Sequence, residues 1–114
     1  MDDVQFIVMV DSAAERSHLV SDLASDFPEL EQRKAHSGRL RGNWLEVYAN
    51  DDADPAAAAD PDNGFLHFRW RVEVTPLDSS VDENHQIRLA RDLLAHFRSA
   101  EATAEVLANF EDRL

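Results

Sequence analysis

Few side chains in this sequence combine a reactive type with a spacing that supports chemistry. The chain has no cysteine, which excludes thiolate catalysis, disulfides and the usual structural zinc sites. Its histidines are scattered singly, none three or four residues from another: His18, His36, His67, His85 and His96. Only three glycines occur, and they form no Gly-rich phosphate-binding loop. The one candidate general base is His67, which is flanked by Arg69 and Glu73.

A second group of residues is better suited to binding than to catalysis. Trp44, Tyr48, Arg69 and Arg71 are of types enriched at interfaces, and they recur at alternate positions in two apolar segments. Together with His67 they form the predicted ligand- or partner-binding set. We expect no catalytic residue other than the candidate His67, no metal ligand and no cofactor.

Five aspartates crowd into one connecting segment: Asp51, Asp52, Asp54, Asp60 and Asp62. Carboxylates suit calcium or magnesium, but the spacing does not fit an EF-hand loop. Counted from Asp60, the fifth position is already Gly64, and Arg71 stands where a bidentate acid is required at the twelfth. We interpret residues 51–64 as a solvated loop between strands, with metal binding or docking to a basic partner as alternatives.

The charge balance narrows the choice of partners. Twenty-three acidic residues against eleven Lys and Arg give a formal net charge of −12. Phosphate backbones and anionic membrane surfaces attract positively charged proteins, so neither nucleic acid nor membrane is an expected partner. A basic protein is favoured, because long-range attraction steers its approach. The alternative is that the acidity only keeps the protein in solution.

The length of 114 residues is typical of one domain, predicted to span residues 1–114. Hydrophobic residues make up 44% of the chain, enough for a core of its own. The apolar run from Phe6 to Val10 is too short to span a bilayer, and Asp2 and Asp3 do not resemble a signal peptide. We therefore expect a cytoplasmic protein.

Hydrophobic periodicity predicts the elements that must position these residues. Strands are expected at 4–10, 44–50, 65–75 and 103–110, and the third has the clearest alternation. Helices are expected at 12–27 and 80–99, opened by capping boxes from Ser12 to Glu15 and from Ser80 to Glu83. Asp54 and Pro55 predict one short helical turn. Residues 29–43 are polar and locally basic, and could be strand or loop.

The order strand, helix, strand, strand, helix, strand predicts an α+β fold of the ferredoxin-like split βαβ type. Its sheet has four antiparallel strands, with two helices on one face and the first and third strands in the centre. Even-numbered residues of the third strand are expected under the helices: Leu66, Phe68, Trp70, Val72 and Val74. The opposite face then carries Gln5, Ile7, Met9, Trp44, Glu46, Tyr48, Phe65, His67, Arg69, Arg71, Glu73, Thr103, Glu105 and Leu107.

This open sheet face is unusually rich in aromatic and apolar residues, which is typical of an interaction surface. Three interpretations are open: stacking of single-stranded RNA, an interface with another protein or a second copy, or cover by the N-terminus or residues 29–43. Glutamates around the arginines, and the overall charge, disfavour RNA.

The leading functional prediction is a non-catalytic acidic interaction module that acts through the open sheet face. A sharper form is an inhibitor or immunity-like protein that masks a basic partner. The predicted partner is thus another protein or a second copy, as a homodimer formed sheet to sheet. The alternative is a dimeric small-ligand-binding or enzymatic α+β domain, whose aromatic and arginine side chains line a pocket beside residues 51–64.

Overall fold

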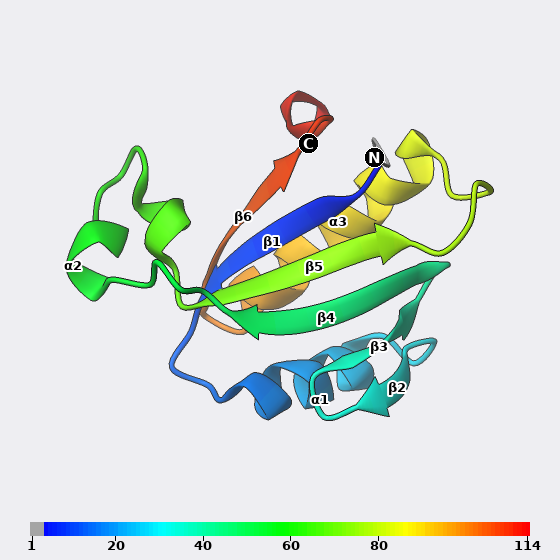
Figure 1. The fold of residues 1–114 in the computed structure, drawn as a ribbon, viewed down its shortest axis with the longest axis horizontal. Helices are drawn as coiled ribbons and strands as arrows, with labels where there is room; N and C mark the ends of the chain where they lie inside the picture. The colour runs from blue at the N-terminus through cyan, green and yellow to red at the C-terminus, as the bar shows by residue number, and fades with distance from the viewer. Residues whose placement is uncertain (1–3) are drawn as a thin grey trace.

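The structure, a computed structural model, describes residues 4–114 and contains one six-stranded antiparallel sheet with three α-helices (Figure 1). The strands lie in the order β2-β3-β4-β5-β1-β6. Their bounds are β1 (Phe6–Asp11), β2 (Glu31–Lys34), β3 (Ser37–Leu40), β4 (Asn43–Ala49), β5 (Trp70–Pro76) and β6 (Thr103–Ala108). The helices are α1 (Arg16–Asp26), α2 (Pro55–Ala58) and α3 (Glu83–Ser99), with 3₁₀ turns η1 (Gly64–His67) and η2 (Glu111–Arg113).

The predicted four-stranded ferredoxin-like sheet with two helices is wrong. Residues 29–43 form the hairpin β2–β3, which extends the sheet beside β4, and α2 adds a third helix. All four residues of β2 are exposed, so this strand lacks the apolar alternation by which strands are found. The turn into β4 uses Arg41 and Gly42 with φ of 49° and 79°, a conformation that favours glycine.

The third predicted strand begins later than expected, at Trp70 rather than at residue 65. Residues 64–67 form η1, and Leu66, expected under the helices, is 45% exposed. The Asn50 side chain explains the difference, because its Nδ2 donates to the Leu66 and Phe68 carbonyls at 3.0 and 2.7 Å. These carbonyls are therefore satisfied by Asn50 and not by a neighbouring strand.

Both predicted capping boxes are wrong, whereas the short helical turn is confirmed. Helix α1 begins after Glu15 without a side-chain cap, and the Ser12 hydroxyl instead accepts from Ala14 N. Helix α3 is capped by Asp82, which accepts from His85 N at 2.8 Å. Asp54 caps α2 as expected, with Pro55 in its first turn.

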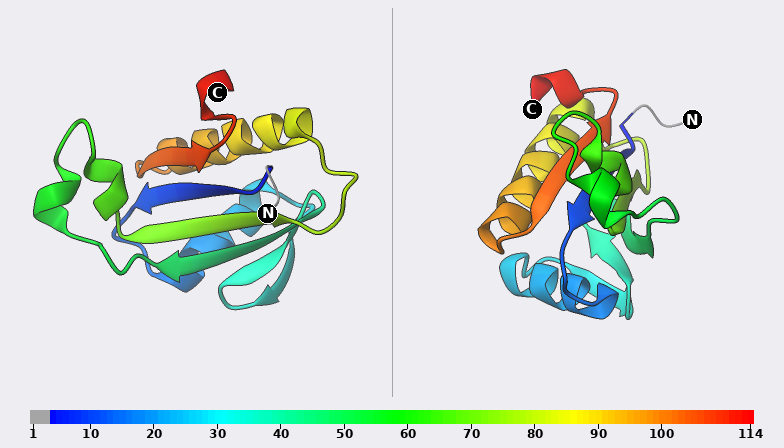
Figure 2. Two further views of the ribbon diagram at one scale, coloured as in Figure 1. Left: turned by 45° about the horizontal axis from the view of Figure 1, so that its top comes forward. Right: turned by 90° about the vertical axis from the view of Figure 1, so that its left-hand side faces the viewer.

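The main core lies between the sheet and the two longer helices, α1 and α3, which cover one face (Figures 1 and 2). The prediction that Trp70, Val72 and Val74 of β5 face these helices is confirmed, since all three are buried in the core cluster. Phe68, also expected under the helices, is buried but does not belong to that cluster, and neither does the buried Met9. Among the helices of residues 4–114, none is long and apolar enough to cross a membrane.

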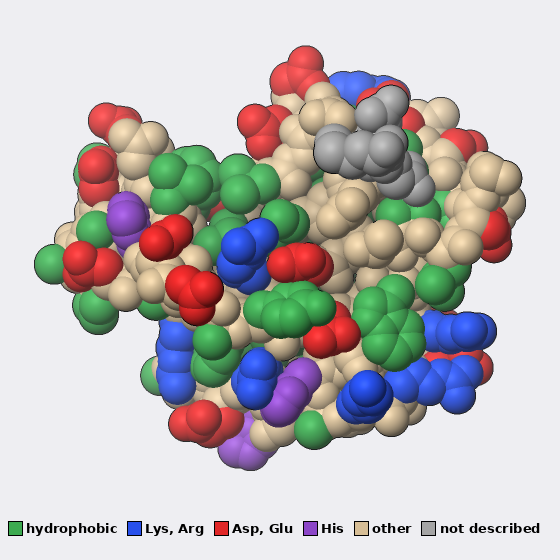
Figure 3. Space-filling model, viewed as in Figure 1, with side chains coloured by type: hydrophobic (Ala, Val, Ile, Leu, Met, Phe, Trp, Pro, Cys, Tyr) green, Lys and Arg blue, Asp and Glu red, His purple; other side chains and the backbone are tan. Residues whose placement is uncertain are grey.

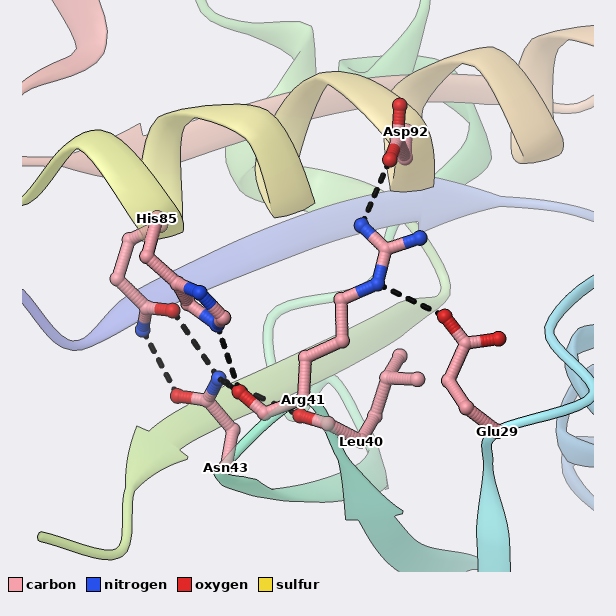
Figure 4. A network of polar contacts seen from close by, with 7 residues as sticks. Glu29, Leu40, Arg41, Asn43, His85 and Asp92 are labelled. Atoms are coloured by element: carbon pink, nitrogen blue, oxygen red, sulfur yellow. Dashed lines mark hydrogen bonds and ion pairs between the residues drawn. The ribbon is translucent and has the colours of Figure 1, made fainter. Parts of the chain in front are cut away.

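A buried pair of amides joins the sheet to α3 (Figure 4). Asn43 on β4 and Gln86 on α3 are fully buried and bond reciprocally, at 3.0 Å and 2.8 Å. The Asn43 amide also donates to the Arg41 carbonyl, and Gln86 donates to the Val4 carbonyl. The pair therefore ties together the turn into β4, the start of α3 and the N-terminal end of β1.

Candidate functional site

The residues of interest lie on the sheet face that α1 and α3 leave open, over β4 and β5. Antiparallel pairing places Tyr48 opposite Arg71, and Glu46 opposite Glu73. Trp44 lies on the same face of β4, at the other side of Glu46 from Tyr48. We call this set the acidic–aromatic patch: Trp44, Glu46, Tyr48, Arg71 and Glu73. On this face, acidic, basic and large hydrophobic side chains alternate over the two strands (Figure 3).

The electrostatics of the acidic–aromatic patch are unbalanced. Glu46 and Glu73 are directly opposite on neighbouring strands, an arrangement of like charges that destabilises a sheet. Arg71 Nη2 is 3.5 Å from Glu73 Oε2, an ion pair of loose geometry, and the buried Arg71 Nε has no hydrogen-bond partner among residues 4–114. The patch thus holds two carboxylates and one guanidinium, and that guanidinium pairs with Glu73.

The aromatic side chains of the patch border these carboxylates. Trp44 Nε1 donates to Glu46 Oε1 at 3.0 Å, and Trp44 is half-buried while Tyr48 is 40% exposed. Partial burial, followed by the carboxylates of Glu46 and Glu73, raises the pKa of the Tyr48 phenol above its ordinary value. The patch therefore presents two aromatic rings beside a local negative charge, a combination that attracts cations.

Titration of Tyr48 tests this proximity directly, because Tyr48 is the single tyrosine of the chain. A phenol ionises to an anion, so nearby carboxylates oppose its ionisation and their removal eases it. We expect Glu46→Gln and Glu73→Gln each to lower the pKa of Tyr48 towards its ordinary value, measured by the ultraviolet absorbance of the phenolate. The exposed Asp22→Asn on α1 serves as a control that leaves this pKa in place.

The structure separates Arg69 from the patch. Its Nη1 donates to the Ala13 carbonyl at 3.0 Å in the β1–α1 connection, and its guanidinium lies over the Trp70 ring, 4.5 Å from the centroid. Nη2 is 3.7 Å from a carboxylate oxygen of Glu15. Arg69 therefore holds the connection ahead of α1 instead of facing a ligand beside Tyr48.

The candidate general base His67 does not belong to strand β5 either. It belongs to η1, and its Nδ1 lies 2.9 Å from the Asp52 carbonyl, where it donates if that nitrogen carries the proton. Its backbone carbonyl accepts from Asp54 N at 3.0 Å. These contacts bind η1 to the segment before α2, so the sequence-predicted set is only partly gathered: Trp44, Tyr48 and Arg71 lie together, and His67 and Arg69 do not.

The sequence also predicted other occupants of the open face. Residues 29–43 lengthen the sheet as β2 and β3 rather than folding over it. Of the N-terminal segment, residues 1–3 lie outside the described part of the chain. Met9, expected to be exposed on this face, is buried. Glu46 and Glu73 were expected on the face but not assigned to the site, because only the strand register shows that they are opposite each other.

A crevice does form beside the 51–64 segment, but other residues line it. Its volume is about 470 Å³, and its carboxylates come from Asp11, Asp60, Asp62 and Glu105. Phe65 and Phe68 supply its aromatic wall. A crevice with this lining repels anionic ligands. Across residues 4–114, no three His, Asp or Glu side chains converge in a way that could hold a metal ion.

One histidine that sequence analysis left without a role has a clear partner. His96 on α3 is buried, and its Nδ1 lies 2.5 Å from Asp26 Oδ2 at the end of α1. The imidazole also packs edge-on against Phe27 and Phe97. This contact fastens the two long helices to each other.

Comparison with known proteins adds no family assignment to this description. No family model matches the sequence, and the searches of curated proteins and of solved structures found no significant match.

Proposed function

We propose that this protein is a non-catalytic acidic interaction module that binds a basic partner protein through the acidic–aromatic patch. The observation that carries the proposal is the pairing of Glu46 with Glu73 across β4 and β5, flanked by Trp44 and Tyr48. Like charges placed opposite each other cost stability in the free protein. A cationic side chain from a partner relieves that repulsion, so the complex is stabilised by an attraction that is missing from the free protein.

The aromatic rings favour the same kind of partner. Arginine and lysine side chains stack on Trp and Tyr faces, and each such contact contributes about 0.5–2 kcal/mol. The net charge of −12 attracts a basic protein from a distance and speeds its capture. A sheet-to-sheet homodimer is the weaker form of this proposal, because it brings two copies of the same acidic surface together.

A more specific form of the proposal is that this protein binds and masks a basic enzyme, with both proteins in the cytoplasm. An inhibitor or immunity-like protein gains from fast association and from a rigid surface, and a sheet provides such a surface. The small-ligand alternative has less support, because Arg69 is engaged elsewhere and the crevice beside residues 51–64 is acidic.

Binding of a labelled arginine- and lysine-rich peptide tests the proposal, with fluorescence anisotropy as the readout. We expect Glu46→Gln combined with Glu73→Gln to weaken binding about tenfold, which corresponds to ~1.4 kcal/mol. Trp44→Ala leaves the charge unchanged and is expected to weaken binding similarly through the lost ring contact. High salt lowers the affinity of the unmodified protein.

The matched control removes two carboxylates elsewhere. Asp22→Asn with Asp112→Asn gives the same change in net charge, at exposed positions on α1 and η2. If this control loses as much affinity as the Glu46 and Glu73 double variant, the attraction is a general effect of charge and the patch is not the binding surface.

A further inference from the structure

The outer edge of β6 is an open strand edge at one end of the sheet. β6 pairs with β1 along its whole length, and within residues 4–114 no strand pairs with its other side (Figures 1 and 2). Backbone groups on such an edge can bond to a strand from another molecule.

Two side chains show which backbone groups point outward. Arg98 Nη2 donates to the Ala104 carbonyl at 3.0 Å, and Ala108 N donates to Glu111 Oε2 at 3.2 Å. Because these groups bond to side chains beyond the sheet, they point away from β1. Backbone direction alternates along a strand, so the N–H and C=O of Val106, midway between them, point the same way.

A crevice with a mixed lining runs along this edge. Its volume is about 410 Å³, its apolar lining comes from Phe65, Leu94, Val106, Leu107 and Leu114, and its charged lining comes from Arg98, Glu105 and Glu111. Leu94 belongs to α3 and Phe65 to η1, so the crevice reaches the edge from two different elements. Paired backbone and buried apolar surface would therefore both contribute to an interface here.

We propose that β6 pairs with β6 of a second copy of this chain, antiparallel, about a two-fold axis at Val106. In that register Val106 bonds to its own counterpart, and Ala104 lies opposite Ala108 of the partner subunit. These are the residues whose backbone groups point outward, so each pair exchanges both of its hydrogen bonds. The two sheets become one continuous sheet.

Charge complementarity selects a second copy as the occupant. The cation Arg98 lies at Ala104, and the anion Glu111 lies at Ala108, two residues to either side of Val106. A two-fold axis at Val106 brings Arg98 of one copy beside Glu111 of the other. The two side chains leave the backbone groups that they cap, and Arg98 also leaves Glu105 of its own chain, a loose and exposed pair at 3.8 Å. Arg98 and Glu111 then bond to each other between subunits.

This interface does not depend on the proposed function. It uses the edge of the sheet, so the acidic–aromatic patch remains free on both subunits. If the basic peptide does not bind, the proposed pairing of β6 is unaffected. If the protein is a monomer, the proposed role of the acidic–aromatic patch is unaffected. Each proposal is therefore tested by a separate measurement.

Sedimentation equilibrium tests the pairing over a wide range of protein concentration, at ~0.15 M salt to screen the repulsion between two acidic chains. We expect a dimer, and we expect Arg98→Glu or Glu111→Arg alone to weaken it about tenfold, since each reversal acts at both symmetric ends. Arg98→Glu combined with Glu111→Arg restores the dimer, because the opposite charges again meet between subunits.

Matched controls lie on the same two elements. Arg88→Glu on α3 and Asp112→Arg on η2 change the net charge identically at exposed positions, and are expected to leave the association unchanged. Hydrogen exchange locates the interface: the outward amides of Ala104, Val106 and Ala108 become more protected as the concentration rises, whereas those of the opposite edge strand, 31–34, do not.

Three results overturn the proposal. The first is a monomer at every concentration. The second is a dimer that tightens in the single variants, which means that Arg98 and Glu111 protect the edge against pairing. The third is a dimer that responds no more to the reversals at Arg98 and Glu111 than to those at Arg88 and Asp112, which places the contact elsewhere.

Discussion

Replacing Trp70 with alanine is expected to lower the free energy of unfolding by about 3–5 kcal/mol. Trp70 is 7% exposed on the helix-covered face of β5, and its Nε1 donates to the Ala14 carbonyl at 3.1 Å. The variant leaves a cavity in the core and removes the indole ring on which the Arg69 guanidinium packs. A loss of this size is a large part of the ~5–15 kcal/mol typical of a folded domain.

Trp44→Ala is the matched control, because Trp44 is the same residue type on the neighbouring strand, half-buried on the open face. Urea denaturation should show a loss of less than about 1.5 kcal/mol for this variant, since its surroundings are partly solvated. If Trp44→Ala costs as much as Trp70→Ala, the assignment of the covered and open faces of the sheet is wrong.

The second large effect is expected at the buried amide pair. Asn43→Ala or Gln86→Ala alone should cost about 3 kcal/mol, because each leaves the other amide buried with unsatisfied donors or acceptors. Asn43 also accounts for a hydrogen bond to the Arg41 carbonyl, next to the turn with positive φ (Figure 4). Its loss therefore weakens both the turn and the anchor to α3.

A double-mutant cycle separates the pair from its surroundings. Asn43→Ala with Gln86→Ala should cost at least about 1 kcal/mol less than the sum of the single variants, because the second change removes the group left unsatisfied by the first. The exposed Asn109→Ala is expected to change stability by less than about 0.5 kcal/mol. Additive losses at Asn43 and Gln86 would contradict a direct coupling of the two amides.

Strong periodicity made part of the fold predictable. β6 lies within its predicted segment, β1, β4 and β5 each overlap theirs and extend one residue past it, and α1 and α3 lie within the predicted helices. Their patterns are readable because one side of each element is packed against a core while the other is solvated. The ends were less predictable, since Ser12 makes a local turn and Asp82 rather than Ser80 caps α3.

The edge strand β2 and the connection before β5 could not be predicted, because they depend on contacts between residues that a local sequence pattern does not show. β2 is exposed on every residue, and only its backbone pairing with β3 makes it a strand. Residues 65–69 alternate like a strand, yet Asn50, distant in sequence, takes the carbonyls of Leu66 and Phe68. Local propensity was overridden there by a tertiary hydrogen-bond network, which turned His67 and Arg69 away from the predicted site.

By itself, the sequence determined part of the open face: its alternation showed that Trp44 and Tyr48 share one side of a strand, with Glu46 between them. The net negative charge of the sequence led us to expect a positively charged partner. Only the tertiary structure decided that Glu73 stands opposite Glu46, that Arg69 is bound to another loop, and that Arg98 and Glu111 flank an open edge. Alternation assigns a side chain to a face, but register and long-range hydrogen bonds decide its neighbours.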